Sequence, residues 1–158
     1  MGLRFYYSVD ESNKSNLLVM GADGSGHDFS SDFRTRGKNS SAELSIRASS
    51  NAVFSGAEGD SIVLDTSNQW MAHYNSNNPT GIQAHFFGYE IINQILSQNG
   101  CVGIRCYYAL NDAGVQQLLL VGVTSTGENI LPLSSTGGRV ADDGTIADVS
   151  FPCPSHCN

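Results

Sequence analysis

The sequence predicts an α+β protein in which an antiparallel sheet packs against two central helices. A β-hairpin pattern occurs twice, at residues 2–29 and 103–130, and a segment of helical character, 62–98, lies between the two occurrences. The chain has 158 residues, which is a suitable length for one domain. We therefore expect a single domain, residues 1–158, whose sheet uses strands from both hairpins.

The two hairpin segments align without a gap when residue 2 is placed on residue 103, an offset of 101. Each consists of an aromatic strand, a polar turn, an apolar strand, a turn rich in Gly and Ser, and a short third strand, which is the pattern of a β-meander. We interpret the two segments as duplicated copies of one unit. The identical pairs are Gly2/Gly103, Arg4/Arg105, Tyr6/Tyr107, Tyr7/Tyr108, Leu17/Leu118, Leu18/Leu119, Gly21/Gly122 and Gly26/Gly127.

The apolar strand of the second copy, residues 118–123, is continuously apolar instead of alternating. Such a strand is expected to be covered on both faces. Residues 30–60 are rich in Ser, Gly and Asn, and this composition predicts loops with short strand candidates at 43–48 and 52–55.

Two helices are predicted between the copies. The first begins with Asp65, Thr66 or Ser67 as its cap and runs to about Tyr74, and the run Asn77-Asn78-Pro79 ends it. The second spans about 82–97 and closes at Asn99-Gly100. The apolar stripe of this second helix consists of Ile91, Ile92, Ile95 and Leu96.

No helical segment precedes the first copy. Its apolar face must therefore pack elsewhere, either on other parts of the same chain or on another chain. The two alternatives predict different functions, because only the second requires the protein to associate with itself.

The composition is acidic and weakly charged. The net charge is −7 and charged residues make up 15% of the chain, so a basic face able to bind nucleic acid or an anionic membrane is not expected. No apolar run has the length of a membrane span, and the N-terminus lacks the pattern of a signal peptide. The location stays open between the cytoplasm and export without a cleaved signal.

Four cysteines are candidates for disulfides: Cys101, Cys106, Cys153 and Cys157. Pairing of Cys153 with Cys157, pairing of the tail with Cys101, and free thiols all stay open. The three-residue gap between Cys153 and Cys157 is longer than the two-residue gap usual in zinc sites. The acidic segment 23–28 is interpreted as a polar turn instead of a calcium loop. We therefore expect no metal site and no cofactor.

Residues 62–130 resemble a family of small uncharacterised bacterial proteins, mostly from Bacteroidota, and the tail is similar to the end of those proteins. The resemblance implies no catalytic residues, because the family has no assigned activity, and the N-terminal hairpin departs from the family pattern. The matching motifs include Trp70, Tyr74, Asn78-Pro79, Ala84-His85-Phe86-Phe87-Gly88, Gly100-Cys101, Tyr107-Tyr108, Val121-Gly122-Val123, Gly144-Thr145-Ile146-Ala147-Asp148 and Pro152-Cys153-Pro154.

These patterns favour a non-catalytic structural or self-assembling protein, a filament or lattice subunit whose main partner is itself. The chain contains no nucleophile elbow, P-loop or dinucleotide fingerprint. The alternative is a small ligand-binding protein or enzyme with a pocket between helices and sheet. The residues expected around that pocket are Trp70, Tyr74, His85, Arg105 and Tyr107.

Overall fold

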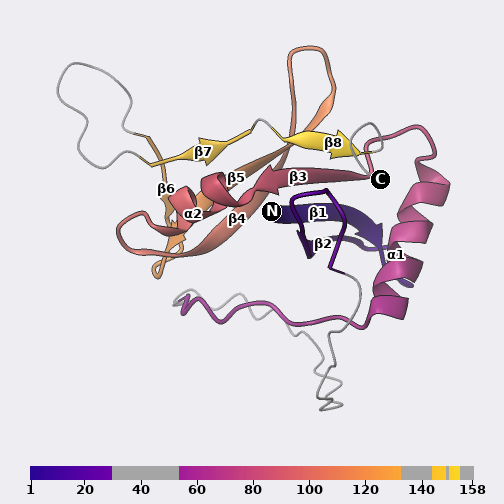
Figure 1. Cartoon of the computed structure of the whole chain (residues 1–158), viewed down its shortest axis with the longest axis horizontal. Helices are drawn as coiled ribbons and strands as arrows, with labels where there is room; N and C mark the ends of the chain where they lie inside the picture. Colours follow the sequence, from indigo (N-terminus) through magenta and orange to yellow (C-terminus); the bar gives the residue numbers. More distant parts are fainter. Residues whose placement is uncertain (30–53, 133–143, 149, 154–158) are drawn as a thin grey trace.

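The structure is a computed structural model that describes residues 1–29, 54–132, 144–148 and 150–153. Two helices and two antiparallel four-stranded sheets confirm the predicted α+β class (Figure 1). In chain order the elements are β1 (Gly2–Val9), β2 (Ser15–Ala22), α1 (Leu64–Asn77), β3 (Ala84–Gly88), α2 (Tyr89–Leu96), β4 (Cys101–Leu110), β5 (Gln116–Thr124), β6 (Asn129–Ile130), β7 (Ile146–Ala147) and β8 (Phe151–Cys153).

The two meanders, residues 2–29 and 103–130, lie in separate sheets. The first sheet has the strand order β2-β1-β3-β8, and the second has the order β4-β5-β6 with β7 also paired to β5. The expectation of one shared sheet is therefore wrong. The apolar face of the first meander packs on α2 and the second sheet of the same chain, which is the first of the two alternatives considered above.

The two meanders have the same internal register. Phe5 pairs with Val19 in the first sheet, and the residues 101 positions later, Cys106 and Leu120, pair in the second. The turn between β1 and β2 has a left-handed residue at Asn13 (φ 62°), and the turn between β4 and β5 has one at the matching position, Gly114 (φ 74°). The sequence offset is therefore also an offset in hydrogen-bonded structure.

The hydrophobic core lies between the two sheets and α2. Its buried residues come from the first sheet, from α2 and from the second sheet, and the rings of Phe5 and Phe87 meet edge to face at 5.6 Å. Helix α1 lies at one end of the molecule beside β1, on the right in Figure 1. The buried core residues are Phe5, Phe87, Ile92, Ile95, Leu118, Leu120 and Ala147.

The second predicted helix begins later than expected. Residues 84–88 form β3, a strand between β1 and β8, and the helix starts at Tyr89. Burial decides this difference: Ala84, His85 and Phe87 are each at most 2% exposed, and a central strand is covered on both faces, whereas an amphipathic helix is buried on one. In α2 itself Ile92 and Ile95 are buried, as the apolar stripe predicts.

The first predicted helix is longer than expected at both ends. Its N-cap is Val63, which makes no side-chain capping bond, and the hydroxyl of Ser67 instead donates to the carbonyl of Leu64. The run Asn77-Asn78-Pro79 ends the helix, as predicted, with Asn78 as the C-cap, but the last helical residue is Asn77 and not Tyr74.

The continuous apolar strand of the second meander is covered on both faces, as predicted. Leu118 and Leu120 are fully buried on one face, and Val121 is 3% exposed on the other. The strand candidate at 43–48 lies outside the described residues. In the candidate at 52–55, the described residues 54 and 55 form no strand.

Two glycines at equivalent positions have very different surroundings. A Cβ added to Gly2 would lie 2.2 Å from the carbonyl oxygen of Phe87 and 2.7 Å from the ring of Phe86, both in β3. A Cβ added to Gly103, the matching residue of β4, meets nothing within 4 Å among the described residues. The first glycine is therefore required by the close approach of β3, and the second is not.

A matched pair of substitutions tests this difference. Gly2→Ala is expected to lower the free energy of unfolding by about 1–3 kcal/mol, because the new methyl group overlaps backbone that cannot move away cheaply. Gly103→Ala is expected to change it by less than about 0.5 kcal/mol. Urea unfolding of both variants measures the two values, and equal losses would contradict the structure.

Candidate functional site

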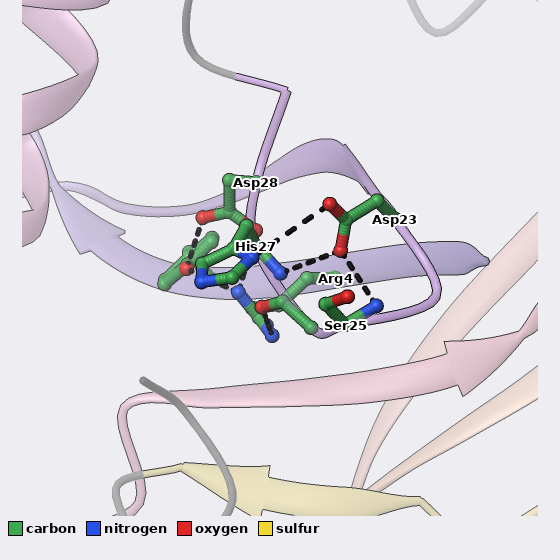
Figure 2. Close-up of polar contacts among 7 residues, drawn as sticks. Arg4, Asp23, Ser25, His27 and Asp28 are labelled. Carbon is green, nitrogen blue, oxygen red and sulfur yellow. Dashed lines mark hydrogen bonds and ion pairs between the residues drawn. The ribbon is translucent and has the colours of Figure 1, made fainter.

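On the face of the first sheet that points away from the core, the side chain of Arg4 is enclosed by hydrogen-bonding partners. Arg4 is 2% exposed and its guanidinium donates to the Asp28 carboxylate at 2.6 Å and to the Gly26 carbonyl at 2.7 Å. The Tyr6 hydroxyl donates to the other oxygen of Asp28 at 2.5 Å. Figure 2 shows Arg4 reaching from β1 toward Asp28 in the turn that follows β2. These bonds fix the turn to the sheet.

The same cluster recurs in the second sheet with a neutral partner. Arg105 donates to the Asn129 side-chain oxygen at 2.5 Å and to the Gly127 carbonyl at 3.1 Å, and the Asn129 amide donates to the Tyr107 hydroxyl at 2.7 Å. Every member stands 101 residues after its counterpart. We name the two groups the first and second arginine clusters.

The environments of the two tyrosines differ. Burial, followed by the hydrogen bond to Asp28, raises the pKa of Tyr6 to about 12. The hydrogen bond from Asn129 is the main reason that the pKa of Tyr107 lies below its ordinary value. In both clusters the arginine bonds join the strand to the turn that follows the next strand.

The acidic segment 23–28 is a turn, in agreement with our interpretation. One oxygen of Asp23 accepts hydrogen bonds from the backbone of Ser25 and His27 (Figure 2). Both oxygens of Asp28 are engaged by the first arginine cluster. Among the described residues, no group of three or more His, Cys, Asp or Glu side chains is placed to hold a metal ion.

A group of tyrosines forms the feature most suited to binding. The ring of Tyr7 in β1 lies 5.4 Å from that of Tyr74 in α1 and 5.6 Å from that of Tyr108 in β4, tilted by 30° and 33°. The group therefore joins α1 to both sheets. Tyr7 and Tyr108 are also equivalent residues of the two meanders, 101 positions apart.

These tyrosines line an open hollow of about 200 Å³, which we call the tyrosine hollow. A second hollow of about 320 Å³ adjoins it, lined by Tyr108, Ala109, Leu110 and Gln116. Tyr108 and Gln116 belong to both. No lining side chain is charged. The residues around the tyrosine hollow are Tyr7, Ser8, Ser15, Asn16, Tyr74, Tyr108 and Gln116.

The Tyr7 hydroxyl is buried and makes no hydrogen bond of good geometry with any described residue. Burial raises the pKa of Tyr7 to about 12, and the neighbouring Gln116 side chain opposes part of this rise. The phenol is therefore a neutral donor at physiological pH. A buried polar group without a partner costs free energy, so its position beside a hollow calls for a functional explanation.

His85 lies behind the tyrosine hollow. It is 1% exposed, its ring meets that of Tyr7 edge to face at 5.6 Å, and its Nδ1 lies 2.6 Å from the Ser150 hydroxyl. Burial lowers the pKa of His85 to about 4, so the ring is neutral near pH 7. The hydrogen-bond partner of this buried ring is therefore a side chain and not the backbone.

The structure does not bring all five predicted pocket residues together. Tyr74 lines the tyrosine hollow, and His85 packs against Tyr7 behind it. Trp70 lies in α1, with its indole N–H buried and unpaired among the described residues. Arg105 and Tyr107 belong instead to the second arginine cluster on the other face of β4.

Sequence reasoning did not identify Tyr7, Tyr108 and Gln116 as site residues. The available signal was the Tyr-Tyr pair at 6–7 and 107–108, which is identical in the two copies. Alternation along a strand places one tyrosine of each pair on the core face and the other on the outer face. Only the positions of the sheets reveal that the two core-face tyrosines meet.

Two of the disulfide candidates, Cys101 and Cys106, are free thiols. A β-bulge lies between Cys101 and Gly103. The Cys101 thiol donates to the carbonyl of Gly103, while Cys106 packs against the core. Burial raises the pKa of the Cys106 thiol to about 11, so it is unreactive near neutral pH. The Cys153 side chain and Cys157 lie outside the described residues, and their pairing stays a prediction.

Comparison of the chain with protein-family models, with curated proteins and with solved structures gave no match. The resemblance to bacterial proteins therefore stays a prediction. Neither helix in the described part of the chain has the length and apolar character needed to cross a membrane.

The buried His85 predicts how stability depends on pH. The unfolded chain takes up a proton near the ordinary pKa of 6.5, but the folded chain does so only near 4. Stability should therefore fall as the pH drops below 6.5, with His85 contributing a loss of about 2 kcal/mol between pH 7 and pH 5.

Denaturant unfolding at several pH values measures this loss in the original protein, in His85→Gln and in His73→Gln. Because His73 is exposed, its variant should keep the full pH dependence, whereas His85→Gln should lose most of it. An unchanged slope in His85→Gln would show that other groups cause the effect.

The two arginine clusters predict unequal responses to exchanging their acidic and amide partners. Asp28→Asn leaves the buried Arg4 without a charged partner, and we expect a loss of about 1–3 kcal/mol in unfolding free energy. Asn129→Asp makes the reciprocal change beside the less buried Arg105, with an expected effect below about 1 kcal/mol. Thermal and urea unfolding compare the two variants, and a larger loss in Asn129→Asp would contradict this account.

Proposed function

We propose that the protein is a non-catalytic, self-assembling structural subunit, in which the sheet of one molecule continues into the sheet of the next. The observation that supports this proposal is a pair of long edge strands, β2 and β4. They contain eight and ten residues, whereas the other edge strands of the described structure, β6, β7 and β8, contain two or three. Long exposed edges are templates for pairing with another chain.

The two long edges carry little of the usual protection against such pairing, which in β4 is a β-bulge between Cys101 and Gly103. Soluble proteins commonly guard an exposed edge with lysine, proline or inward-pointing charge. β2 has no charged residue and no proline, and Val19 within it is 52% exposed. β4 has one charge, Arg105, which is directed to its own turn. By contrast, the short edge strand β8 contains Pro152.

Each open edge corresponds to a covered edge in the other sheet. β1 is covered by β3, but the equivalent edge of β4 pairs with no described strand, and Gly103 has open space where Gly2 contacts β3. Likewise β7 pairs with Leu120 and Val121 of β5, whereas the equivalent stretch of β2, Val19 and Met20, pairs with β1 and with no other strand in the described part of the chain. We interpret the meanders as duplicated copies of one unit, each missing a strand that the other has.

The occupant we assign to each open edge is a second copy of the chain. The edge of β2 differs from that of β4, so pairing between them joins different surfaces and does not close on itself. Such a contact generates an open row of molecules. The low charge of the surface, with 15% charged residues in the chain, reduces the repulsion that would oppose close approach.

A charge placed on one edge tests the proposal. Val19→Lys should prevent assembly, because pairing would bring the ammonium group into the new interface. Val63→Lys is the matched control, since Val63 has a similar exposure of 60% but lies at the start of α1, away from both edges. Light scattering and sedimentation velocity over a wide concentration range should show growing mass for the original protein and the control, but not for Val19→Lys.

A monodisperse monomer at all concentrations would overturn the proposal. Equal assembly of Val19→Lys and the original protein would exclude β2 as the interface. The alternative function, a small ligand-binding protein, is favoured by one separate observation, the buried Tyr7 hydroxyl in the tyrosine hollow.

A further inference from the structure

The tyrosine hollow combines aromatic rings with neutral hydrogen-bonding groups. Its lining contains three tyrosines, two serines, one asparagine and one glutamine, and no charged side chain. A charged ligand would therefore lose its hydration without gaining an ionic partner. A purely apolar ligand would leave the polar groups of the lining without hydrogen bonds. The chemistry of the hollow thus selects a neutral ligand that has both apolar surface and hydroxyl groups.

The Tyr7 hydroxyl supplies the most specific requirement. The residue is 3% exposed and belongs to the lining of the hollow; the Gln116 side chain interacts with its hydroxyl oxygen, and the hydroxyl proton has no acceptor among the described residues. A ligand oxygen at this position would accept that proton. The Asn16 side-chain oxygen is a further polar group beside it, because the amide nitrogen is already bonded to Asp10 and Lys14.

The exposed ring of Tyr108 supplies the apolar contact. This residue is 58% exposed, and it lies at the border between the two hollows. The C–H face of a pyranose ring packs well on an aromatic ring, while its hydroxyls extend outward to hydrogen-bonding groups at the rim. Tyr108 is therefore placed as a platform, and Tyr7, Asn16 and Gln116 are placed around it as polar partners.

We propose that the tyrosine hollow binds a neutral sugar, with one pyranose ring on Tyr108 and a hydroxyl hydrogen-bonded to Tyr7. The volume of about 200 Å³ is smaller than the usual site for a drug-sized ligand and suits a single sugar unit. The adjoining hollow of about 320 Å³ shares Tyr108 and Gln116, so a second unit of an oligosaccharide would occupy it. The hollow includes Ser15 and Asn16 of β2 and Tyr108 of β4, so assembly through these strands would alter it, and sugar binding is therefore measured on unassembled protein.

The test titrates the full-length protein with glucose, galactose, mannose and N-acetylglucosamine, and with cellobiose, maltose, lactose and chitobiose. Saturation-transfer difference NMR detects contact with the sugar ring protons, and calorimetry measures the affinity. We expect at least one of these sugars to bind saturably, with its disaccharide binding more tightly. The Val19→Lys variant serves as the protein sample, so that assembly does not affect the result.

Three variants locate the contact. Tyr108→Ala should weaken binding at least tenfold through loss of the platform, and Tyr7→Phe should weaken it about fivefold through loss of one neutral hydrogen bond. Tyr107→Ala is the matched control, because this tyrosine is the neighbour of Tyr108 on the opposite face of β4, and its binding should be unchanged. Circular dichroism checks that each variant is folded.

Three results would overturn the inference. The first is no saturable signal from any of the sugars. The second is unchanged affinity in folded Tyr108→Ala or in folded Tyr7→Phe. The third is binding of a proline-rich peptide at Tyr108 with no sugar binding, which would assign the aromatic surface to a protein partner instead.

Discussion

The structure depends on the burial of one face of each sheet between the two meanders and α2. In β1 the side chains of Phe5 and Tyr7 point to this interior, and the alternating positions Arg4 and Tyr6 point outward. The same alternation 101 residues later directs Tyr108 inward and Arg105 outward. The pairing register of β1 therefore matters for the whole arrangement. A shift by one residue would turn Arg4 from the outer face of the sheet toward the hydrophobic core.

This packing brings equivalent residues together, as a twofold dimer interface does. The contact of Tyr7 with Tyr108 is the clearest case, and the two differ greatly in exposure, at 3% and 58%. The difference follows from the position of α1, whose Tyr74 packs beside Tyr7 in β1, so one tyrosine is enclosed and the other remains available. Two meanders with the same register but unequal neighbours thus leave a hollow where Tyr7 and Tyr108 meet.

The sequence was sufficient to predict the features that depend on local pattern. The α+β class, the stop of α1 at the run Asn77-Asn78-Pro79 and the double-sided burial of β5 follow from periodicity and turn chemistry. β3 was mistaken for helix, because a five-residue apolar run fits either structure until its neighbours are known. The sequence also could not predict which strands pair outside each hairpin, because no local pattern in the hairpins distinguishes two sheets from one. Tyr74 was predicted at the site, whereas Tyr7 and Tyr108 become neighbours only through tertiary packing.

The central claim is that β2 and β4 present open edges that pair between molecules. Amide hydrogen exchange, followed residue by residue at low and high protein concentration, tests it most directly. We expect the outward amides of β2 and β4 to exchange rapidly in dilute solution and to become protected as concentration rises, while those of β1 and β5 stay protected throughout. Protection of the β4 edge in the dilute protein, or no gain of protection in the concentrated one, would contradict the account.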